Sequence, residues 1–269
     1  MYCDAHLHLV DLDDREPGFA VQIGNLSWCG AVDSHDPAEF LRSEDLRKQL
    51  PPTLQGFGIH PQNPDMANAD FLVTLIQEKR ISFIGEAGFD FFGDNPLTTR
   101  SAAALATQTE AFLFQCRMAA AAQLPLVLHI RKATDVLMQH WRQLLPVPRV
   151  VLHCWPGRLE EARMLLSKGI EAWFSFGTPL LRGSPHALES LRGLPLNRIL
   201  AETDAPWQPP HGKPWTRLQD IVRIVHCMAS VLEVPENELE ESLTSNFIDV
   251  YGEPSSRPLP IKEQSHGLH

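Results

Sequence analysis

The sequence predicts an α/β fold, a (β/α)8 barrel of the TIM type, on the strength of three observations. The 269 residues suit one barrel of about 250 residues, eight short apolar segments recur along the chain, and helical patterns separate most of them. Most of these segments are apolar throughout, as expected for parallel strands covered on both faces. The predicted strands are residues 3–8, 20–26, 55–60, 81–86, 125–129, 149–153, 170–176 and 198–204.

Three helices are predicted from apolar residues spaced three or four positions apart. Residues 216–232 carry a continuous apolar stripe, and Thr216 with Gln219 resembles a capping box at its start. Residues 158–168 show a similar stripe, and residues 99–123 are rich in Ala. Strands that alternate with such helices indicate a parallel sheet, and eight of them indicate closure into a barrel.

The first crossover departs from this pattern. Only residues 9–19 separate the first two predicted strands, and this acidic segment shows no helical pattern. A parallel crossover usually needs a dozen or more residues. Either the first outer helix is therefore missing or shortened, or the second predicted strand is misplaced.

The composition indicates one soluble globular domain. Hydrophobic residues make up 43% of the chain and charged residues 21%. We expect the barrel to cover residues 1–252 and a loose tail to cover residues 253–269, which show no periodicity. No apolar segment approaches the roughly 18 residues needed to cross a bilayer, and no targeting pattern opens the chain, so a cytoplasmic location is expected.

Charge and cysteine content limit the classes of partner. The five cysteines are scattered without a C-x-x-C pair, which favours reduced thiols. The net charge of −10 disfavours a broad electrostatic grip on nucleic acid. Bound divalent ions can reverse the local potential of an acidic pocket, so a phosphate substrate is still compatible with this charge. The sequence indicates no protein partner, and a monomer is the simplest expectation.

Six side chains at strand ends form a candidate metal site. His6 and His8 lie two positions apart on a strand, so both side chains point to the same face. In this architecture functional groups come from the C-terminal ends of several strands. Each of the six could alone be a hydrogen-bonded core group, but together they favour metal ligands. The predicted ligands are His6, His8, Glu86, His129, His153 and Asp204.

This ligand set predicts two divalent ions. Four imidazoles and two carboxylates suit Zn²⁺ or Mn²⁺, whereas Mg²⁺ prefers more oxygen ligands. Six ligands exceed the three or four that one catalytic zinc usually takes. Glu86 offers two oxygens and is the natural bridge, and Asp204 could be both a ligand and a proton acceptor. Such a pair of ions can bind a hydroxide nucleophile.

Seven short sequence blocks follow one another between residues 4 and 247. They are Asp4-x-His6-x-His8, Gly58-Ile59-His60-Pro61, Gly85-Glu86-Ala87-Gly88-Phe89-Asp90, Leu124-Pro125 with His129-x-Arg131-x-Ala133, His153-Cys154-Trp155-Pro156-Gly157, Glu202-Thr203-Asp204-Ala205-Pro206-Trp207 and Asn246-Phe247. Together these blocks closely resemble the TatD family of metal-dependent hydrolases.

The resemblance implies a barrel hydrolase that binds two divalent cations, Zn²⁺, Mn²⁺ or Mg²⁺. It places His6, His8, Glu86 and Asp204 around one ion, and Glu86, His129 and His153 around the other. It also assigns the catalytic roles to Asp204, as proton acceptor, and to Glu86. Family members are typically DNases, so DNA or another phosphodiester is the expected substrate. The alternative is hydrolysis of a small amide, lactone or other ester.

The sequence departs from the family pattern near the site. Residues 208–214 form a short loop without the Arg and Asn-x-Pro element that many members carry, and Trp155-Pro156 replaces a Phe-Ser-like pair. These departures concern the substrate more than the metal site.

Secondary candidates have two readings each. His60 could contact substrate or complete the metal shell, or it could fix the turn at Pro61. Arg131 could clamp a phosphate through its planar guanidinium, or form a salt bridge at the rim. Asp90 could orient a ligand histidine or cap a loop. The histidines outside the blocks, including His35, are predicted to be surface or structural.

Overall fold

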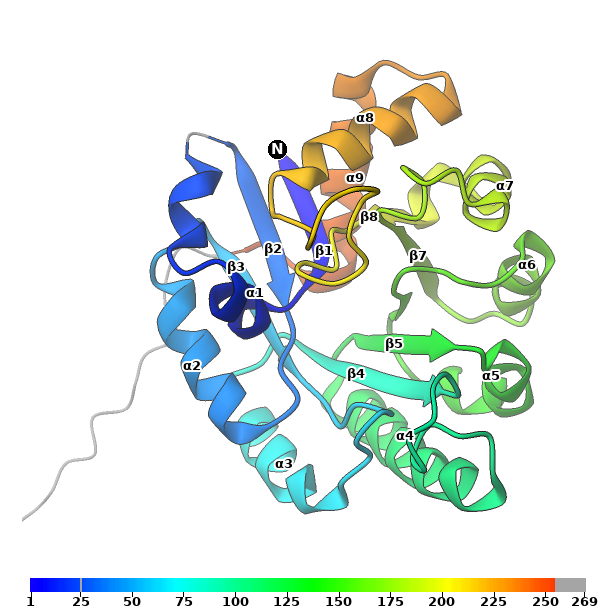
Figure 1. Cartoon of the computed structure of the whole chain (residues 1–269). Helices are drawn as coiled ribbons and strands as arrows, with labels where there is room; N and C mark the ends of the chain where they lie inside the picture. Colours follow the sequence, from blue (N-terminus) through cyan, green and yellow to red (C-terminus); the bar gives the residue numbers. More distant parts are fainter. Residues whose placement is uncertain (25, 255–269) are drawn as a thin grey trace, which may run out of the picture.

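The computed structural model describes residues 1–24 and 26–254, except for the side chains at positions 21 and 22. In this part of the chain, eight parallel strands pair in chain order and surround a common centre, with helices on the outside (Figure 1). This confirms the predicted (β/α)8 barrel. The strands are β1 (Tyr2–Leu7), β2 (Trp28–Val32), β3 (Thr53–Phe57), β4 (Phe83–Asp90), β5 (Leu126–Arg131), β6 (Val150–Leu152), β7 (Ala172–Phe176) and β8 (Ile199–Ala201).

Hydrogen bonds near the C-terminal ends of β1 and β8 join the last strand to the first. The Asp204 amide donates to the His6 carbonyl at 3.0 Å, and the His8 amide donates to the Ala205 carbonyl at 2.8 Å. This closure brings the last predicted ligand next to the first two.

The outer layer follows the expected alternation. Its helices are α1 (Leu9–Arg15), α2 (Pro37–Arg47), α3 (Ala69–Gln77), α4 (Ala102–Ala122), α5 (Thr134–His140), α6 (Leu159–Ser167), α7 (Pro185–Gly193), α8 (Asp220–Leu232) and α9 (Glu236–Tyr251). Short 3₁₀ turns are η1 (Phe19–Ile23), η2 (Met66–Asn68), η3 (Trp141–Leu144) and η4 (Leu196–Arg198). Among the described helices, none is both long and apolar enough to cross a membrane.

The second predicted strand, residues 20–26, is wrong. The apolar run forms the 3₁₀ turn η1, with Phe19 and Ile23 buried, and the true strand β2 follows it. Periodicity alone cannot tell whether a short apolar segment forms a strand or a helical turn. Gly30 also interrupts the apolar pattern of β2. A Cβ atom at position 30 would lie 2.6 Å from the ring of Trp28, so there is no room for a larger residue.

This correction also resolves the first crossover. The acidic segment forms α1, a helix of seven residues that buries Leu9 and Leu12. The first outer helix is therefore shortened, not missing. The segment between β1 and β2 is longer than expected because the second strand begins at Trp28.

The other predicted helices are confirmed, with different ends. The capping box at Thr216 is wrong, since α8 begins at Asp220 and the Thr216 hydroxyl instead donates to the Trp207 carbonyl at 2.5 Å. Helices α4 and α6 begin and end within a few residues of the predicted limits. Residues 255–269 of the predicted tail lie outside the described residues.

Helix α9 packs at the N-terminal end of the barrel, beside β1 and β8. Its Phe247 and Tyr251 join the cluster of inward-facing strand residues that includes Phe83. The Tyr251 hydroxyl donates to the Ala5 carbonyl at 2.9 Å. The end of the barrel opposite the site is thus filled by α9.

Asn246 joins α9 to the strand that leads to the site. Its side-chain amide donates to the carbonyls of Leu196 and Ile199, each at 2.8 Å. We expect Asn246→Ala to lower the free energy of unfolding by about 2 kcal/mol, because two carbonyls lose their partner. Urea unfolding measures this. Ser242→Ala is the control, since it removes only an exposed bond within α9. Equal stability of both variants would contradict this role.

Candidate active site

The six predicted ligands meet at the C-terminal mouth of the barrel. His6, Glu86 and His129 lie within β1, β4 and β5, while His8, His153 and Asp204 directly follow or lie just beyond β1, β6 and β8. Five of the six side chains are buried, and that of His129 is 15% exposed. Strands from all sides of the barrel therefore supply one compact group of polar atoms.

Glu86 lies at the centre of this group. Its Oε2 atom is 3.4 Å from His6 Nε2 and 3.5 Å from His8 Nε2. Its Oε1 atom is 2.8 Å from His153 Nε2 and 3.1 Å from His129 Nδ1. The two carboxylate oxygens thus face two separate pairs of imidazoles.

Asp204 completes the first of these two sets. Its Oδ1 atom lies 3.4 Å from His8 Nε2 and 3.8 Å from His6 Nε2. The two imidazole Nε2 atoms are 3.1 Å apart. Ligand atoms of these three residues all lie within 4.8 Å of one another, which is close enough for one ion to contact all three.

The chemistry of these atoms fits divalent cations. Ring nitrogens of different histidines face each other and face carboxylates, yet each neutral imidazole can supply only one N–H. Within the described chain, Glu86 and Asp204 form their ion pairs with histidines rather than with Lys or Arg. Buried carboxylates need a compensating positive charge. Mixed nitrogen and oxygen ligands suit ions of intermediate softness.

Carboxylates behind the site orient the histidines. Asp90 Oδ2 lies 3.0 Å from His129 Nε2, so the other ring nitrogen faces Glu86. Asp90 Oδ1 also accepts from the Phe92 amide at 2.8 Å, so Asp90 contacts the histidine and caps the loop as well. Glu202 Oε1 lies 3.6 Å from His153 Nδ1 in the same kind of arrangement.

Asp33 stands behind His6 in the same way as Glu202 stands behind His153. Its Oδ2 atom lies 3.6 Å from His6 Nδ1. Burial is the main cause that raises the pKa of Asp33, to about 7. Asp33 follows β2 and was not among the predicted site residues, because that strand was misplaced.

The pKa values of the buried groups reflect their crowding. Burial raises the pKa of Glu86, but the positive charges of His6 and His153 outweigh this effect and hold the pKa well below its ordinary value. Burial opposes protonation of His8, yet Asp204 and Glu86 raise its pKa to about 10. A cation bound between these carboxylates would compete with a proton on His8.

Comparison with known proteins decides the family. The model of the TatD related DNase family matches residues 3–252. The chain belongs to the TatD family of metal-dependent hydrolases. One relative of the TatD chain is an uncharacterized metal-dependent hydrolase of Mycoplasma pneumoniae, 30% identical over 91% of this chain and 97% of the relative.

Another relative is named 3'-5' ssDNA/RNA exonuclease TatD, from a Pantoea species. It is 31% identical to this TatD chain over 69% of this chain and 71% of the relative. The crystal structure of YJJV, a TatD homolog from Escherichia coli, covers 94% of this chain and 98% of its own, with a TM-score of 0.78 and 24% identity. That likeness supports the barrel fold.

The structure adds His35 to the TatD site. His35 Nε2 lies 3.3 Å from Glu86 Oε2, although the sequence indicated only a surface or structural role. The side chain is 23% exposed and lies among the predicted ligands, because His35 follows the true strand β2. With β2 placed correctly, the position of His35 just beyond a strand end would have identified it as a site residue.

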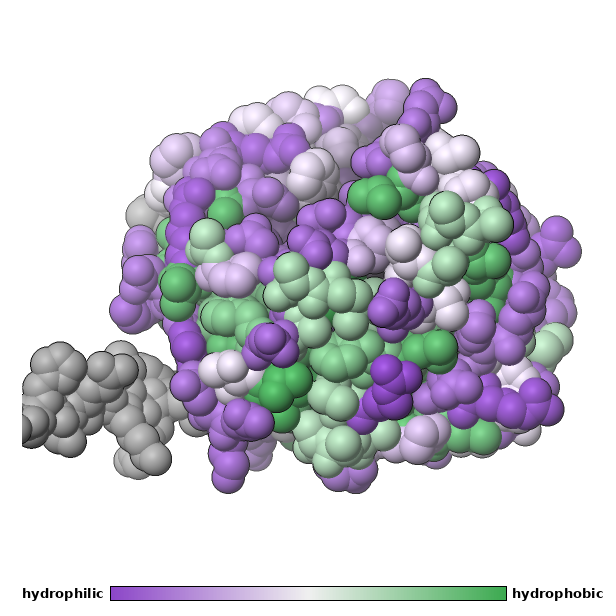
Figure 2. All heavy atoms as spheres, turned by 90° about the horizontal axis from the view of Figure 1, so that it is seen from below, coloured by the Kyte–Doolittle hydropathy of each residue, from purple (hydrophilic) through white to green (hydrophobic). Residues whose placement is uncertain are grey.

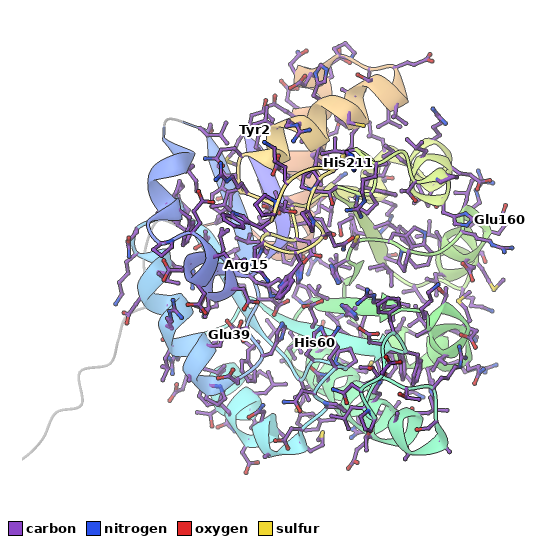
Figure 3. All side chains as sticks on the ribbon, in the orientation of Figure 1. Tyr2, Arg15, Glu39, His60, Glu160 and His211 are labelled. Carbon is purple, nitrogen blue, oxygen red and sulfur yellow. The ribbon has the colours of Figure 1, made fainter. Side chains whose placement is uncertain are left out.

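His60 lies beside Glu86 and also within the turn at Pro61. Its Nε2 atom lies 3.7 Å from Glu86 Oε2, and its Nδ1 accepts from the Gln62 amide at 3.1 Å in the turn after Pro61. Figure 3 places His60 over the centre of the barrel, whereas Glu160 lies on α6 at its outer side. His60 therefore faces the same carboxylate oxygen as His35.

We expect His35→Ala to weaken Mn²⁺ binding by about 10- to 100-fold, the loss typical of groups that support a metal site. The reason is the contact of His35 with Glu86. Calorimetric titration of the protein after chelation measures the affinity. His226→Ala is the control, because the side chain of His226 is 72% exposed and pairs with Glu236. Equal Mn²⁺ affinity of the two variants would refute a site role for His35.

Arg131 lies at the rim rather than against the ligands. Its guanidinium carbon is 3.7 Å from the ring centroid of Phe92, whose side chain is 49% exposed. The predicted salt bridge is not found within the described residues. The guanidinium is therefore exposed beside the mouth of the barrel.

The aromatic residues beside the ligands differ from one another. Trp155 is buried and packs against Phe174, with ring centroids 5.1 Å apart, so it forms part of the barrel wall. Trp207 is 43% exposed, and its indole N–H donates to Asp11 at 3.1 Å. Of these two tryptophans, Trp207 is the one whose ring is exposed to solvent.

Proposed function

We propose that this TatD-family hydrolase is a divalent-metal-dependent phosphodiesterase that cleaves nucleic acid and acts as a deoxyribonuclease. The observation that carries the proposal is Glu86, whose two oxygens face two separate sets of imidazoles. Supporting it, relatives such as the Pantoea protein are named as ssDNA/RNA exonucleases.

The proposed ion sites follow from the distances around Glu86. His6, His8 and Asp204 with Glu86 Oε2 would hold one ion, and His129 and His153 with Glu86 Oε1 would hold the other. When bound, two divalent ions lower the pKa of a water molecule and stabilise charge developing on phosphate oxygens.

Asp204 is the proposed proton acceptor. Burial raises the pKa of Asp204, whereas the hydrogen bond with His8 and the charge of His153 lower it by more. The pKa therefore lies below its ordinary value. The side chain is therefore a carboxylate at neutral pH, the form that can accept a proton from water. Gln208 Nε2 donates to Asp204 Oδ2 at 2.8 Å and fixes its orientation.

The substrate would approach between the rim and the ligands. We assign phosphate binding to Arg131, because its planar guanidinium is exposed beside the mouth and is matched to phosphate oxygens. His60 is half-buried beside Glu86, and desolvation holds its pKa well below the ordinary value, so it would contact the substrate as a neutral imidazole. These two contacts would position a phosphodiester above the ions.

Nuclease assays test this proposal. Single-stranded DNA, double-stranded DNA and RNA are incubated with the protein and Mn²⁺, Mg²⁺ or Zn²⁺, and bis-p-nitrophenyl phosphate is compared with lactones and N-acyl amino acids. We expect metal-dependent cleavage of nucleic acid and of the phosphodiester. Turnover of lactones or N-acyl amino acids without phosphodiester cleavage would refute the proposal and establish the alternative hydrolase.

A further inference from the structure

The outer surface of α4 is unusually poor in charge. The chain holds 23 basic and 33 acidic residues, but this helix of 21 residues contains only Arg117 and Glu110. Outer helices of globular proteins usually present a charged or polar face to solvent. Figure 2 views the molecule from the side where α3 and α4 lie in Figure 1, and apolar side chains spread across the middle of this face.

The inner face of α4 does not explain this composition. There, Gln108 bonds to the backbone N–H and C=O of Asp90, and Gln115 does the same for Ile59. These contacts tie α4 to the ends of β3 and β4 behind the site. The apolar residues of the outer face take no part in them.

An open groove follows the outer side of α4. One part, of about 610 Å³, is lined by Ala102, Leu105, Ala106 and Leu113 among others. A second part, of about 390 Å³, is lined by Ala120, Ala121 and Pro146 among others. Arg117 lines both parts, so the groove continues along the helix.

The residues of this groove repeat at helical spacing. Ala106, Glu110, Leu113, Arg117 and Ala121 follow one another at intervals of three or four, so they lie on one face of α4. Alanine at both ends of this set allows the backbone of another helix to approach closely. The groove also contains Thr109, His140 and Gln143, and its elongated course along α4 is suited to a helix.

We propose that the occupant is α4 of a second copy of this chain, packed antiparallel across a two-fold axis near Leu113. Antiparallel pairing places Glu110 of one copy opposite Arg117 of its partner, and does so twice. Parallel pairing would place like charges together. Within the described chain neither residue forms an ion pair. The face is thus complementary to itself, as a two-fold interface requires.

The overall charge supports this face as the contact. Two copies of a chain with net charge −10 repel each other over most of their surfaces. The face of α4 carries one charge of each sign and avoids this repulsion. Leu105, which lines the groove, is 36% exposed and would be covered by the partner. In this proposal the chain forms a dimer, whereas a monomer is the simplest expectation from the sequence alone.

Sedimentation velocity of the full chain over a range of micromolar concentrations tests the proposal. The expected mass is twice 30.2 kDa. Ala106→Glu should yield monomers, because a charged side chain replaces a close helix contact. Met164→Glu on α6 is the matched control, since Met164 is 46% exposed but lies away from α4, and this variant should stay dimeric. Circular dichroism verifies that each variant is folded.

A charge exchange tests the antiparallel arrangement. Glu110→Arg and Arg117→Glu should each raise the dimer dissociation constant at least about tenfold, because each places like charges together. The double variant should restore dimerisation. A monomeric parent protein, a dimer unaffected by Ala106→Glu, or failure of the double variant to recover would each overturn the proposal. A different protein that co-purifies on this face with a monomeric parent would also overturn it.

Discussion

The Glu86→Gln variant should lose both bound ions together. The substitution keeps the shape of the side chain but removes the negative charge that faces both pairs of imidazoles. We expect divalent metal binding to weaken by more than about 100-fold, beyond the loss typical of an outer supporting residue. Elemental analysis of the purified protein and a Mn²⁺ titration measure the change.

Glu160→Gln is the matched control for this variant. Glu160 is exposed on α6 and lies at the outer side of the barrel (Figure 3). It should bind metal like the parent protein. Loss of only one ion from Glu86→Gln, with the other held at parental affinity, would show that Glu86 does not serve both sets of ligands.

The Asp204→Asn variant should lose turnover much more than it loses metal. An amide cannot accept the proton that the carboxylate would take, and general-base catalysis contributes about 10²- to 10⁴-fold. We expect kcat on a phosphodiester to fall by this factor. His6, His8 and Glu86 are unchanged in this variant and would still hold the first ion. Its metal content should therefore fall less than that of Glu86→Gln.

Steady-state kinetics with Asp70→Asn as control tests this expectation. Asp70 is exposed on α3, away from the site, and its variant should keep the parental kcat. An Asp204→Asn variant with parental kcat would remove Asp204 from the chemistry. An Asp204→Asn variant that binds no metal would assign it a binding role instead.

Most of the barrel could be predicted because its strands are apolar throughout and end in polar residues. That pattern located β1 and β3 to β8, together with polar residues at or just beyond their ends. The pattern failed at β2, where Gly30 packs against Trp28 and shortens the apolar run. The apolar residues of η1, such as Phe19 and Ile23, resemble a short strand, and periodicity cannot distinguish the two in so short a segment.

Because β2 was misplaced, two residues of the site were not predicted. His35 and Asp33 both follow that strand, and both lie against predicted ligands or Glu86. A misplaced strand therefore hid two polar side chains of the site, although the rule used for the other ligands applies to them as well. The six ligands could be predicted from the sequence because the strands that carry them were placed correctly.

Distances across the barrel could not be predicted from spacing. The sequence indicates that Glu86 has two oxygens, but the closure of β8 onto β1 decides which histidines each oxygen faces. The stacking of Arg131 on Phe92 likewise depends on how the loop after β4 folds back. These features depend on contacts between segments far apart in the chain.

The central claim is that Glu86 stands between two metal ions. Anomalous diffraction from crystals soaked in Mn²⁺ tests it most directly. We predict two anomalous peaks, one among His6, His8 and Asp204 and the other beside His129 and His153, with one Glu86 oxygen next to each. A single peak, or two peaks that both lie on one side of Glu86, would contradict the account.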